Sequence, residues 1–361
     1  MTAPDLPSRS SLYGLAAFGW NERVARLITR FPHRIPGRVV RVDRIRYRVA
    51  TAHGTTDAYA GPHDKGSESG APVTGDWVGL AVGADQRAYV AAILPRSSVI
   101  KRLDPSTAGA RPQEQVLVAN LDLVMVVHAV DRPIQLSRLE RTLVMAWESG
   151  ATPVLVLTKA DLLTTGALAD VEHKVRRIAP GVEVITVSNV TGFGLGELLG
   201  LMKAGVTGAF VGESGSGKST LINNLLNEQL QETGPTRSSD GKGRHITSSR
   251  ELAVIPGAGV VIDTPGLRAI GLWSGRDGLT KAFPDVEGLA AYCQFADCRH
   301  EEEPGCAVEA AVERNELERR RIDNYQKMES EIAQQERQRK RNRTDQKDAD
   351  QHRRREQQES G

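Results

Sequence analysis

A glycine-rich loop at residues 212–219 ends in Lys-Ser and lies between an apolar run and a helix-forming segment, a combination that few folds accommodate. The apolar residues 207–211 predict a short strand, and residues 219–226 predict a helix. Glycines let the backbone N–H groups turn inward around phosphates, and the helix N-terminus adds partial positive charge. We therefore expect an α/β sheet with a nucleotide phosphate at the carboxyl ends of its strands.

Two side chains of this loop have predicted chemical roles. Lys218 is expected to reach the β- and γ-phosphates and to act in catalysis, and the Ser219 hydroxyl is expected to bind Mg²⁺. A chance turn before a helix is the alternative, but such a turn has no reason to end in Lys-Ser. The residues predicted to contact nucleotide here are Gly212, Glu213, Ser214, Gly215, Ser216, Gly217, Lys218, Ser219 and Thr220.

A second phosphate-side element follows the loop. Residues 252–255 and 259–262 predict two strands joined by a Pro-Gly turn, and the second strand leads into Asp-Thr-Pro-Gly. Asp263 can hold the water shell of a metal ion, and Gly266 can offer its N–H to a γ-phosphate. Taken alone, the same four residues also suit an ordinary turn that begins at Asp.

The residues predicted to select the base lie upstream of the phosphate loop. The apolar run 153–157 predicts a strand buried on both faces, and it ends in Thr-Lys-Ala-Asp. Asp161 can accept hydrogen bonds from guanine N1–H and the exocyclic amine, a donor pair that adenine lacks, while the stem of Lys159 lies over the purine. Thr158 stands where most GTPases have Asn, so we expect some loss of guanine selectivity.

A strand over 182–187 leads to a second base-side candidate, Ser188 and Asn189, where a backbone N–H can meet guanine O6. An ordinary helix cap explains Ser188 equally well. In the usual numbering of GTPase motifs, the two base-reading elements are the fourth and fifth, the phosphate loop is the first, and Asp-Thr-Pro-Gly is the third. Along this chain they therefore occur in the order fourth, fifth, first, third. With a further strand over 121–130 and a helix over 136–149, they predict a doubly wound parallel sheet.

These motifs resemble those of the RsgA family, GTPases that depend on the small ribosomal subunit. The resemblance covers about residues 35–330. It is carried by PVTGDWV at 72–78, EQVLVANLD at 114–122, RPIQLSRLERTLVMAWESGATPVLVLTKADL at 132–162, GRHIT at 243–247 and DTPGLR at 263–268.

The resemblance implies a multidomain α/β protein in which a circularly permuted P-loop GTPase domain lies between an N-terminal β-barrel (OB-fold) and a C-terminal helical zinc domain. The expected division is a basic extension (1–36), the OB-fold (37–100), the GTPase domain (112–275), the zinc-binding helical domain (276–335), and a charged tail, disordered or a frayed helix (336–361).

The activity that the resemblance implies is GTP hydrolysis stimulated by the 30S small ribosomal subunit, with binding to 16S rRNA and a role in late subunit maturation. The implied cofactors are GTP or GDP, Mg²⁺ and one structural Zn²⁺, in a cytoplasmic monomer. No run of 18 apolar residues and no signal-like stretch occurs, so no membrane association is expected. The alternatives are a P-loop ATPase or nucleotide kinase, and a non-hydrolytic RNA-binding scaffold that nucleotide stabilises.

Positive charge is concentrated at the two ends of the chain. Residues 1–50 hold ten arginines against three acids, and residues 337–355 hold nine basic residues against three acidic ones. Such blocks indicate a polyanionic partner, or else solvated tails, which we favour for the last 30 residues. Residues 37–50 alternate basic and apolar side chains and predict one half-exposed strand with a basic face. Strands at 56–60, 77–82 and 88–93 would complete a small barrel, with Trp77 as a structural residue.

All three cysteines of the chain lie within fourteen residues. Cys293, Cys298 and Cys306, with His300 among them, are a complete tetrahedral ligand set for zinc. Four protein ligands leave no open position for a water, so a structural role is expected. Buried free cysteines beside a surface histidine are the alternative. Residues 307–331 then predict helices.

Residues 232–250 are rich in Gly, Ser, Thr and Arg and lack apolar periodicity, as a switch loop would. Within it the resemblance makes Thr247 the candidate for contact with Mg²⁺ and the γ-phosphate, with Ser248 as a substitute. Leu267 stands where many GTPases place a glutamine that orients the attacking water. The resemblance makes His245 the candidate for that role, and the alternative is a surface histidine or an RNA contact.

Overall fold

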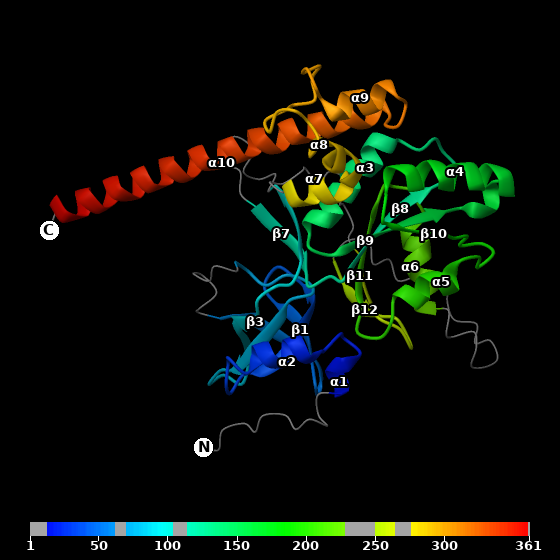
Figure 1. Ribbon diagram of the computed structural model, residues 1–361. Helices are drawn as coiled ribbons and strands as arrows, with labels where there is room; N and C mark the ends of the chain where they lie inside the picture. Colours follow the sequence, from blue (N-terminus) through cyan, green and yellow to red (C-terminus); the bar gives the residue numbers. More distant parts are fainter. Residues whose placement is uncertain (1–12, 62–69, 104–113, 228–249, 264–275, 360–361) are drawn as a thin grey trace.

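The structure of this chain is a computed structural model that describes residues 13–61, 70–103, 114–227, 250–263 and 276–359. Figure 1 shows a small barrel in blue and cyan, a larger sheet with helices in green, and a group of yellow to red helices at the top. Among the described residues, no helix combines the length and apolar character that crossing a bilayer requires.

The N-terminal part is a closed five-stranded barrel with the strand order β1-β2-β3-β5-β4. Its strand pairs are antiparallel except for β3 and β5, which are parallel, as in an OB-fold. Valine, leucine and alanine side chains from all five strands fill its interior. The elements are α1 (Tyr13–Ala16), α2 (Glu22–Ile28), β1 (Ile35–Val42), β2 (Tyr47–Thr51), β3 (Gly54–Ala60), β4 (Trp77–Val82) and β5 (Ala88–Ile93).

The prediction of one basic-faced strand over residues 37–50 was wrong. The segment is a hairpin of β1 and β2, whose turn is closed by a 2.9 Å hydrogen bond from Asp43 N to Arg46 O. A register shift after Val39 interrupts the alternation, and Arg38 points inward with 1% of its surface exposed. The Arg38 guanidinium lies 5.0 Å from the ring of Trp77, which is buried as expected of a structural residue.

The central sheet has six strands in the order β10-β9-β8-β11-β13-β12, and only β12 is antiparallel to its neighbour. From β8 the chain builds outward to β10, and from β11 it builds in the opposite direction, so the strand order reverses between β8 and β11. In a doubly wound sheet, ligands bind at the carboxyl ends of the strands beside such a reversal. The elements are β8 (Leu123–Ala129), α3 (Leu136–Glu148), β9 (Thr152–Thr158), η4 (Ala160–Leu162), α4 (Thr165–Ile178), β10 (Glu183–Thr186), α5 (Leu195–Leu201), β11 (Thr207–Gly212), α6 (Lys218–Asn227), β12 (Leu252–Val254) and β13 (Val260–Asp263).

A separate two-stranded sheet of β6 (Val99–Leu103) and β7 (Glu114–Ala119) connects barrel and central sheet. The loop before β4 fastens them further, because the Thr74 hydroxyl donates to Arg250 O at 3.1 Å and the Asn120 amide donates to Gly75 O at 3.1 Å. Gly75 has φ 94°, and a Cβ there would lie 2.1 Å from Ala119 O. This contact between domains therefore requires glycine.

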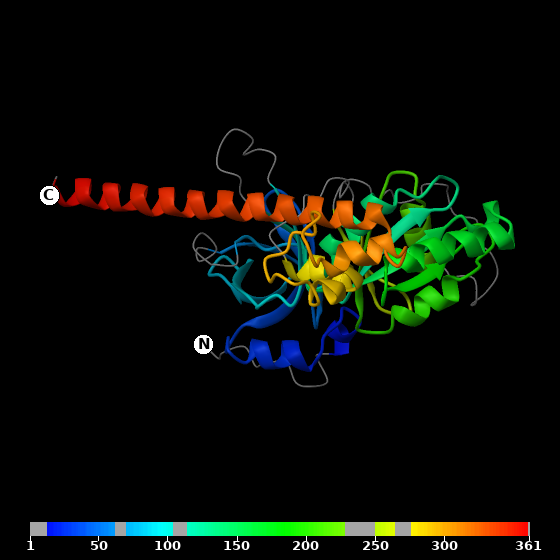
Figure 2. The same ribbon diagram turned by 45° about the horizontal axis from the view of Figure 1, so that its top comes forward.

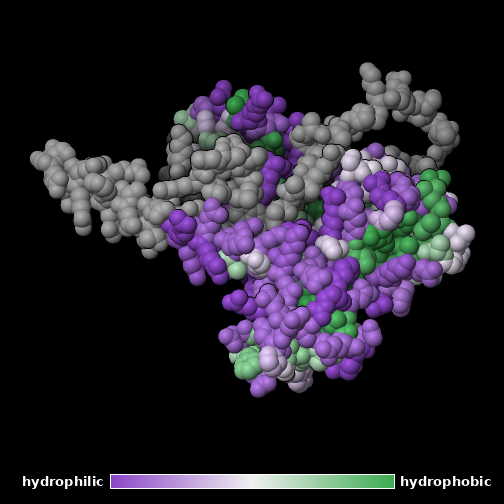
Figure 3. Space-filling view, turned by 90° about the horizontal axis from the view of Figure 1, so that it is seen from above, coloured by the Kyte–Doolittle hydropathy of each residue, from purple (hydrophilic) through white to green (hydrophobic). Residues whose placement is uncertain are grey.

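The C-terminal helices are α7 (Arg276–Ala282), α8 (Pro284–Ala290), α9 (Ala307–Glu313) and α10 (Arg319–Glu359). α10 extends well past the rest of the described chain (Figures 1 and 2), and the described part of the charged tail, up to Glu359, is helical. Its first turns are anchored by Arg321, which is 3% exposed and pairs with Glu140 at 2.9 Å and with Asp285 at 2.5 Å. Seen from above, the coloured surface is mostly hydrophilic (Figure 3).

Candidate functional site

The glycine-rich loop connects β11 to α6, as the sequence predicts. Gly212, Gly215 and Gly217 have φ values of 153°, 74° and 82°, which side chains rarely adopt. A Cβ on Gly212 would also lie 2.3 Å from Val127 O of the neighbouring strand. The Lys218 ammonium donates to Gly212 O at 2.7 Å and to the Glu213 carbonyl at 2.6 Å, so it lies over the loop.

The predicted base-reading residues meet beside this loop. Lys159, at the end of β9, has φ 62°, and its ammonium lies 2.5 Å from Asp131 in the loop after β8. This hydrogen bond lowers the pKa of Asp131 below its ordinary value. Asp161 accepts a short hydrogen bond from the Ser188 hydroxyl, which joins the loops after β9 and β10.

Two side chains form hydrogen bonds between the predicted base-reading segments and the phosphate loop. The sequence did not predict either hydrogen bond. The buried Thr158 hydroxyl lies 2.7 Å from Ser216 O and 3.3 Å from His128 O, both possible acceptors. The Asn189 amide donates to Gly217 O at 3.3 Å. The hydroxyl at position 158 therefore contacts the phosphate loop.

The remaining predicted contacts fall partly outside the described residues. Asp263 ends β13 and pairs in parallel register with Phe210 of β11, so it lies at the carboxyl end of its strand, beside the strand that leads into the phosphate loop. Ser219 and Thr220 are exposed in the first turn of α6. His245, Thr247 and Gly266 lie outside the described residues, and their roles stay predictions.

A cavity of about 30 Å³ lies behind the phosphate loop, between β8 and α3. It is lined in part by His128, Arg138 and Glu213. The His128 Nε2 atom has no hydrogen-bond partner within the described part of the chain, and burial lowers the pKa of this histidine. A cavity of this size holds about one water molecule. The sequence pattern marks only a strand end here and did not reveal the cavity.

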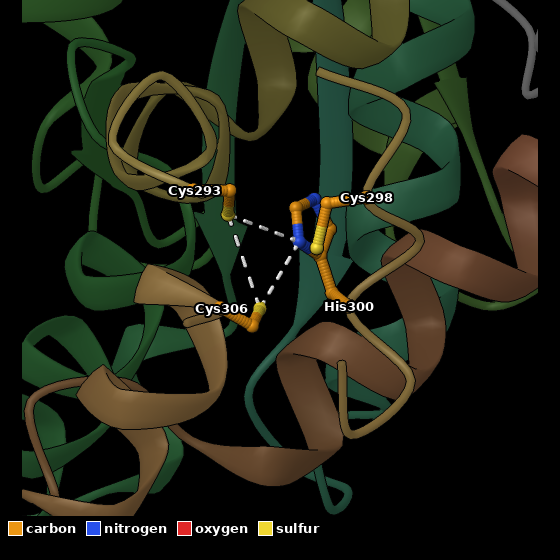
Figure 4. Close-up of side chains that lie close together, drawn as sticks. All are labelled: Cys293, Cys298, His300 and Cys306. Atoms are coloured by element: carbon orange, nitrogen blue, oxygen red, sulfur yellow. Dashed lines mark hydrogen bonds between the residues drawn. The ribbon is translucent and has the colours of Figure 1, made fainter. Parts of the chain in front are cut away.

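The predicted metal ligands form one cluster, with the donor atoms of Cys293, Cys298, His300 and Cys306 all within 4.8 Å of one another (Figure 4). The Cys293 and Cys306 Sγ atoms are 3.9 Å apart, and His300 Nδ1 lies 3.6 Å from Cys293 Sγ and 3.4 Å from Cys306 Sγ. Tetrahedral zinc with ordinary bond lengths holds two thiolates about 3.8 Å apart. The donor set and its spacing therefore fit a tetrahedral metal ion.

Local structure positions two ligands of this cluster, Cys306 and His300. Cys306 is the N-cap of α9, where its Sγ accepts the Glu309 N–H at 3.4 Å, and α10 contributes Gln326, whose amide donates to His300 O at 2.7 Å. Desolvation and the neighbouring thiols raise the pKa of Cys298 to about 12. A metal ion binds the deprotonated thiolate, so metal binding at this cluster would release thiol protons.

Comparison with known proteins supports the order of motifs that the fold displays. Residues 93–273 match the family described as RsgA GTPase, and residues 207–341 match the family described as 50S ribosome-binding GTPase. The small ribosomal subunit biogenesis GTPase RsgA of Streptomyces avermitilis is 43% identical over 91% of this chain and 89% of that protein. The protein of the same name from Streptomyces coelicolor is 42% identical over 89% of this chain and 87% of its own length.

Solved structures give the same result for the fold. The crystal structure of YjeQ from Thermotoga maritima has a TM-score of 0.61 at 25% identity and covers 83% of this chain and 99% of its own. YloQ, described as a circularly permuted GTPase, has a TM-score of 0.60 at 24% identity and covers 84% of this chain and 96% of its own. In this chain the strands β8 to β10 precede the phosphate loop, an order that agrees with a permuted GTPase domain. Given the family match and the similarity to these relatives over most of its length, the chain is a member of the RsgA GTPase family.

Proposed function

We propose that this chain binds GTP between the loops after β9 and β10 and the glycine-rich loop, hydrolyses it, and acts in late maturation of the small ribosomal subunit. The observation that carries the site is the contact of Thr158 with Ser216 O at 2.7 Å, because it joins the base-reading segment to the phosphate loop. The curated relatives that match over most of the chain are named for small-subunit biogenesis, which supports the partner.

Each predicted side chain has a role in this proposal. Asp161 accepts from guanine, Lys159 covers the base, and a backbone N–H of the Ser188–Asn189 segment meets guanine O6. Lys218 leaves the loop carbonyls that it now contacts and moves to the β- and γ-phosphates. The N–H groups of residues 212–220 surround the phosphates.

Mg²⁺ fits the hydroxyl and carboxylate donors at the same edge of the sheet. Ser219 is exposed in the first turn of α6, and Asp263 ends the strand beside the phosphate-loop strand. We propose that Ser219 and Thr247 bind the ion and that Asp263 holds its water shell. When bound, the ion neutralises charge that develops on the phosphate oxygens.

Water activation requires a group other than residue 267, because a leucine side chain neither donates nor accepts a hydrogen bond. We propose that the neutral imidazole of His245 orients the attacking water. We further propose that binding to the ribosomal subunit orders the segment that carries His245, so that the subunit stimulates hydrolysis.

The Cys293, Cys298, His300 and Cys306 cluster is proposed to hold one structural Zn²⁺. Four protein ligands would leave no open position on the ion, which supports a structural role. The hydrogen bond from Gln326 of α10 to His300 O supports a role of the ion in holding α9 and α10 together. Zinc would therefore stabilise the C-terminal helices and take no part in hydrolysis.

Binding to the 16S rRNA of the 30S subunit is proposed from the distribution of charge. Arg44, Arg46 and Arg48 lie on the β1–β2 hairpin and are exposed or partly exposed, although Arg46 also pairs with Asp57 at 2.7 Å. Affinity carried by such contacts falls steeply as salt rises. Consistent with this partner, we propose that the chain acts as a monomer in the cytoplasm.

The test measures GTP hydrolysis by the wild type and by His245→Ala, with and without purified small subunits, in single and multiple turnover. We expect slow turnover alone, marked stimulation by the subunits, and loss of that stimulation in the variant. Competition between GTP and ATP is measured in parallel. Preference for ATP would contradict the assignment of Asp161 as the base-reading residue, and absence of multiple turnover on subunits would favour a non-hydrolytic scaffold. Equal rates of wild type and variant would remove His245 from the mechanism.

A further inference from the structure

A row of alternating charges extends from the base-reading lysine to the phosphate loop. Lys159 contacts Asp131 at 2.5 Å, and Asp131 lies 3.4 Å from the Arg132 guanidinium. Arg132 in turn lies 3.7 Å from Glu213 of the phosphate loop, which pairs with Arg138 at 2.8 Å. Three cations thus share two carboxylates, which leaves an excess of one positive charge beside the predicted nucleotide.

The excess charge is located on Arg132. Each carboxylate has a nearer cation, because Asp131 is bound by Lys159 and Glu213 by Arg138. The contacts of Arg132 with the same two carboxylates are longer, and its side chain is 41% exposed. Its guanidinium can therefore rotate toward an anion without breaking a close ion pair.

Arg132 also lies directly against the phosphate loop. A Cβ built on Gly215 would be 3.3 Å from Arg132 Nη2, and Gly215 has φ 74°. The missing side chain at position 215 therefore leaves the guanidinium free access to the loop. The row begins at Lys159, which is proposed to cover the base, and it ends at the phosphate loop. A nucleotide bound there would therefore present its α- and β-phosphates to Arg132.

We propose that Arg132 binds the α- and β-phosphates of the nucleotide, which GDP and GTP share. The proposal rests on guanine-nucleotide binding at this site. Arg132 thereby differs from a residue that acts only on the γ-phosphate, because its ion pair is retained after hydrolysis. It contributes to affinity for substrate and product alike.

The test compares the wild type with Arg132→Gln, which removes the charge, and Arg132→Lys, which keeps it. Arg177→Gln is the matched control, because Arg177 is a 55% exposed arginine of α4 that pairs with Glu318. Dissociation constants for GDP and for a non-hydrolysable GTP analogue are measured by displacement of a fluorescent nucleotide. Thermal unfolding of each variant reports whether it is folded.

We expect Arg132→Gln to raise both dissociation constants roughly tenfold, as loss of a charge-assisted hydrogen bond predicts. Arg132→Lys should lie in between, and Arg177→Gln should bind as the wild type does. Unchanged affinities, or a loss confined to the GTP analogue, would overturn the proposal and leave guanine-nucleotide binding intact. A wild type that binds no guanine nucleotide would defeat both.

Discussion

Replacing Thr158 by valine tests whether this residue acts on the phosphate loop or on the base. Valine keeps the shape of threonine and removes only the hydroxyl, which lies 2.7 Å from Ser216 O in a position with 0% exposure. A buried polar group that loses a hydrogen-bond partner costs about 1–3 kcal/mol. If the hydroxyl holds the loop in its binding conformation, an intermediate cost of about 1.4 kcal/mol weakens nucleotide binding about tenfold.

The two roles differ in selectivity. If Thr158 acts through the phosphate loop, the substitution weakens the binding of GDP and of ADP by the same factor. If Thr158 reads the base, the substitution changes the ratio of the two dissociation constants. Both constants are measured by displacement of a fluorescent nucleotide, together with the free energy of unfolding in urea. Thr29→Val is the control, because the Thr29 hydroxyl donates to Arg26 O at 2.7 Å on the exposed surface. Wild-type affinity and stability for Thr158→Val, or a changed ratio, would refute the reasoning.

Three further predictions concern stability. Gly75→Ala should lower the free energy of unfolding by roughly 3 kcal/mol, because its Cβ would meet Ala119 O at 2.1 Å, whereas Gly54→Ala, with positive φ but nothing within 4 Å, should cost about 1–2 kcal/mol; urea unfolding measures both. Burial raises the pKa of Glu148, so its ionised form destabilises the fold: Glu148→Gln should raise Tm at pH 7, and the gain should vanish below the ordinary glutamate pKa of about 4.3. A pH-independent difference would contradict this. Cys298→Ser should abolish bound zinc, measured by atomic absorption, and lower Tm while GDP affinity stays unchanged, since the cluster is predicted to be structural.

The sequence alone determined the features that depend on neighbours along the chain. The glycines at 212, 215 and 217 are required by local backbone conformation, and the apolar runs that became β9 and β11 are visible as continuous hydrophobic segments. The cluster of Cys293, Cys298, His300 and Cys306 was also predicted from the sequence, because residue types and close spacing of this kind are typical of a metal site. In each case the signal that predicted the feature lies in one short segment of the sequence, although Gly212 also meets Val127 O of a distant strand.

Tertiary structure decided the rest. Alternation along residues 37–50 did not reveal the turn at Asp43–Arg46, nor that Arg38 is buried, because its acceptors, Gly75 O and Asn120 O, come from distant segments. Thr158 and Ser216 are likewise far apart in the sequence and meet only where β9 and β11 end on one edge of the sheet. A hydrogen bond between distant segments depends on strand order and register, and a permuted chain fixes that order only when the sheet assembles.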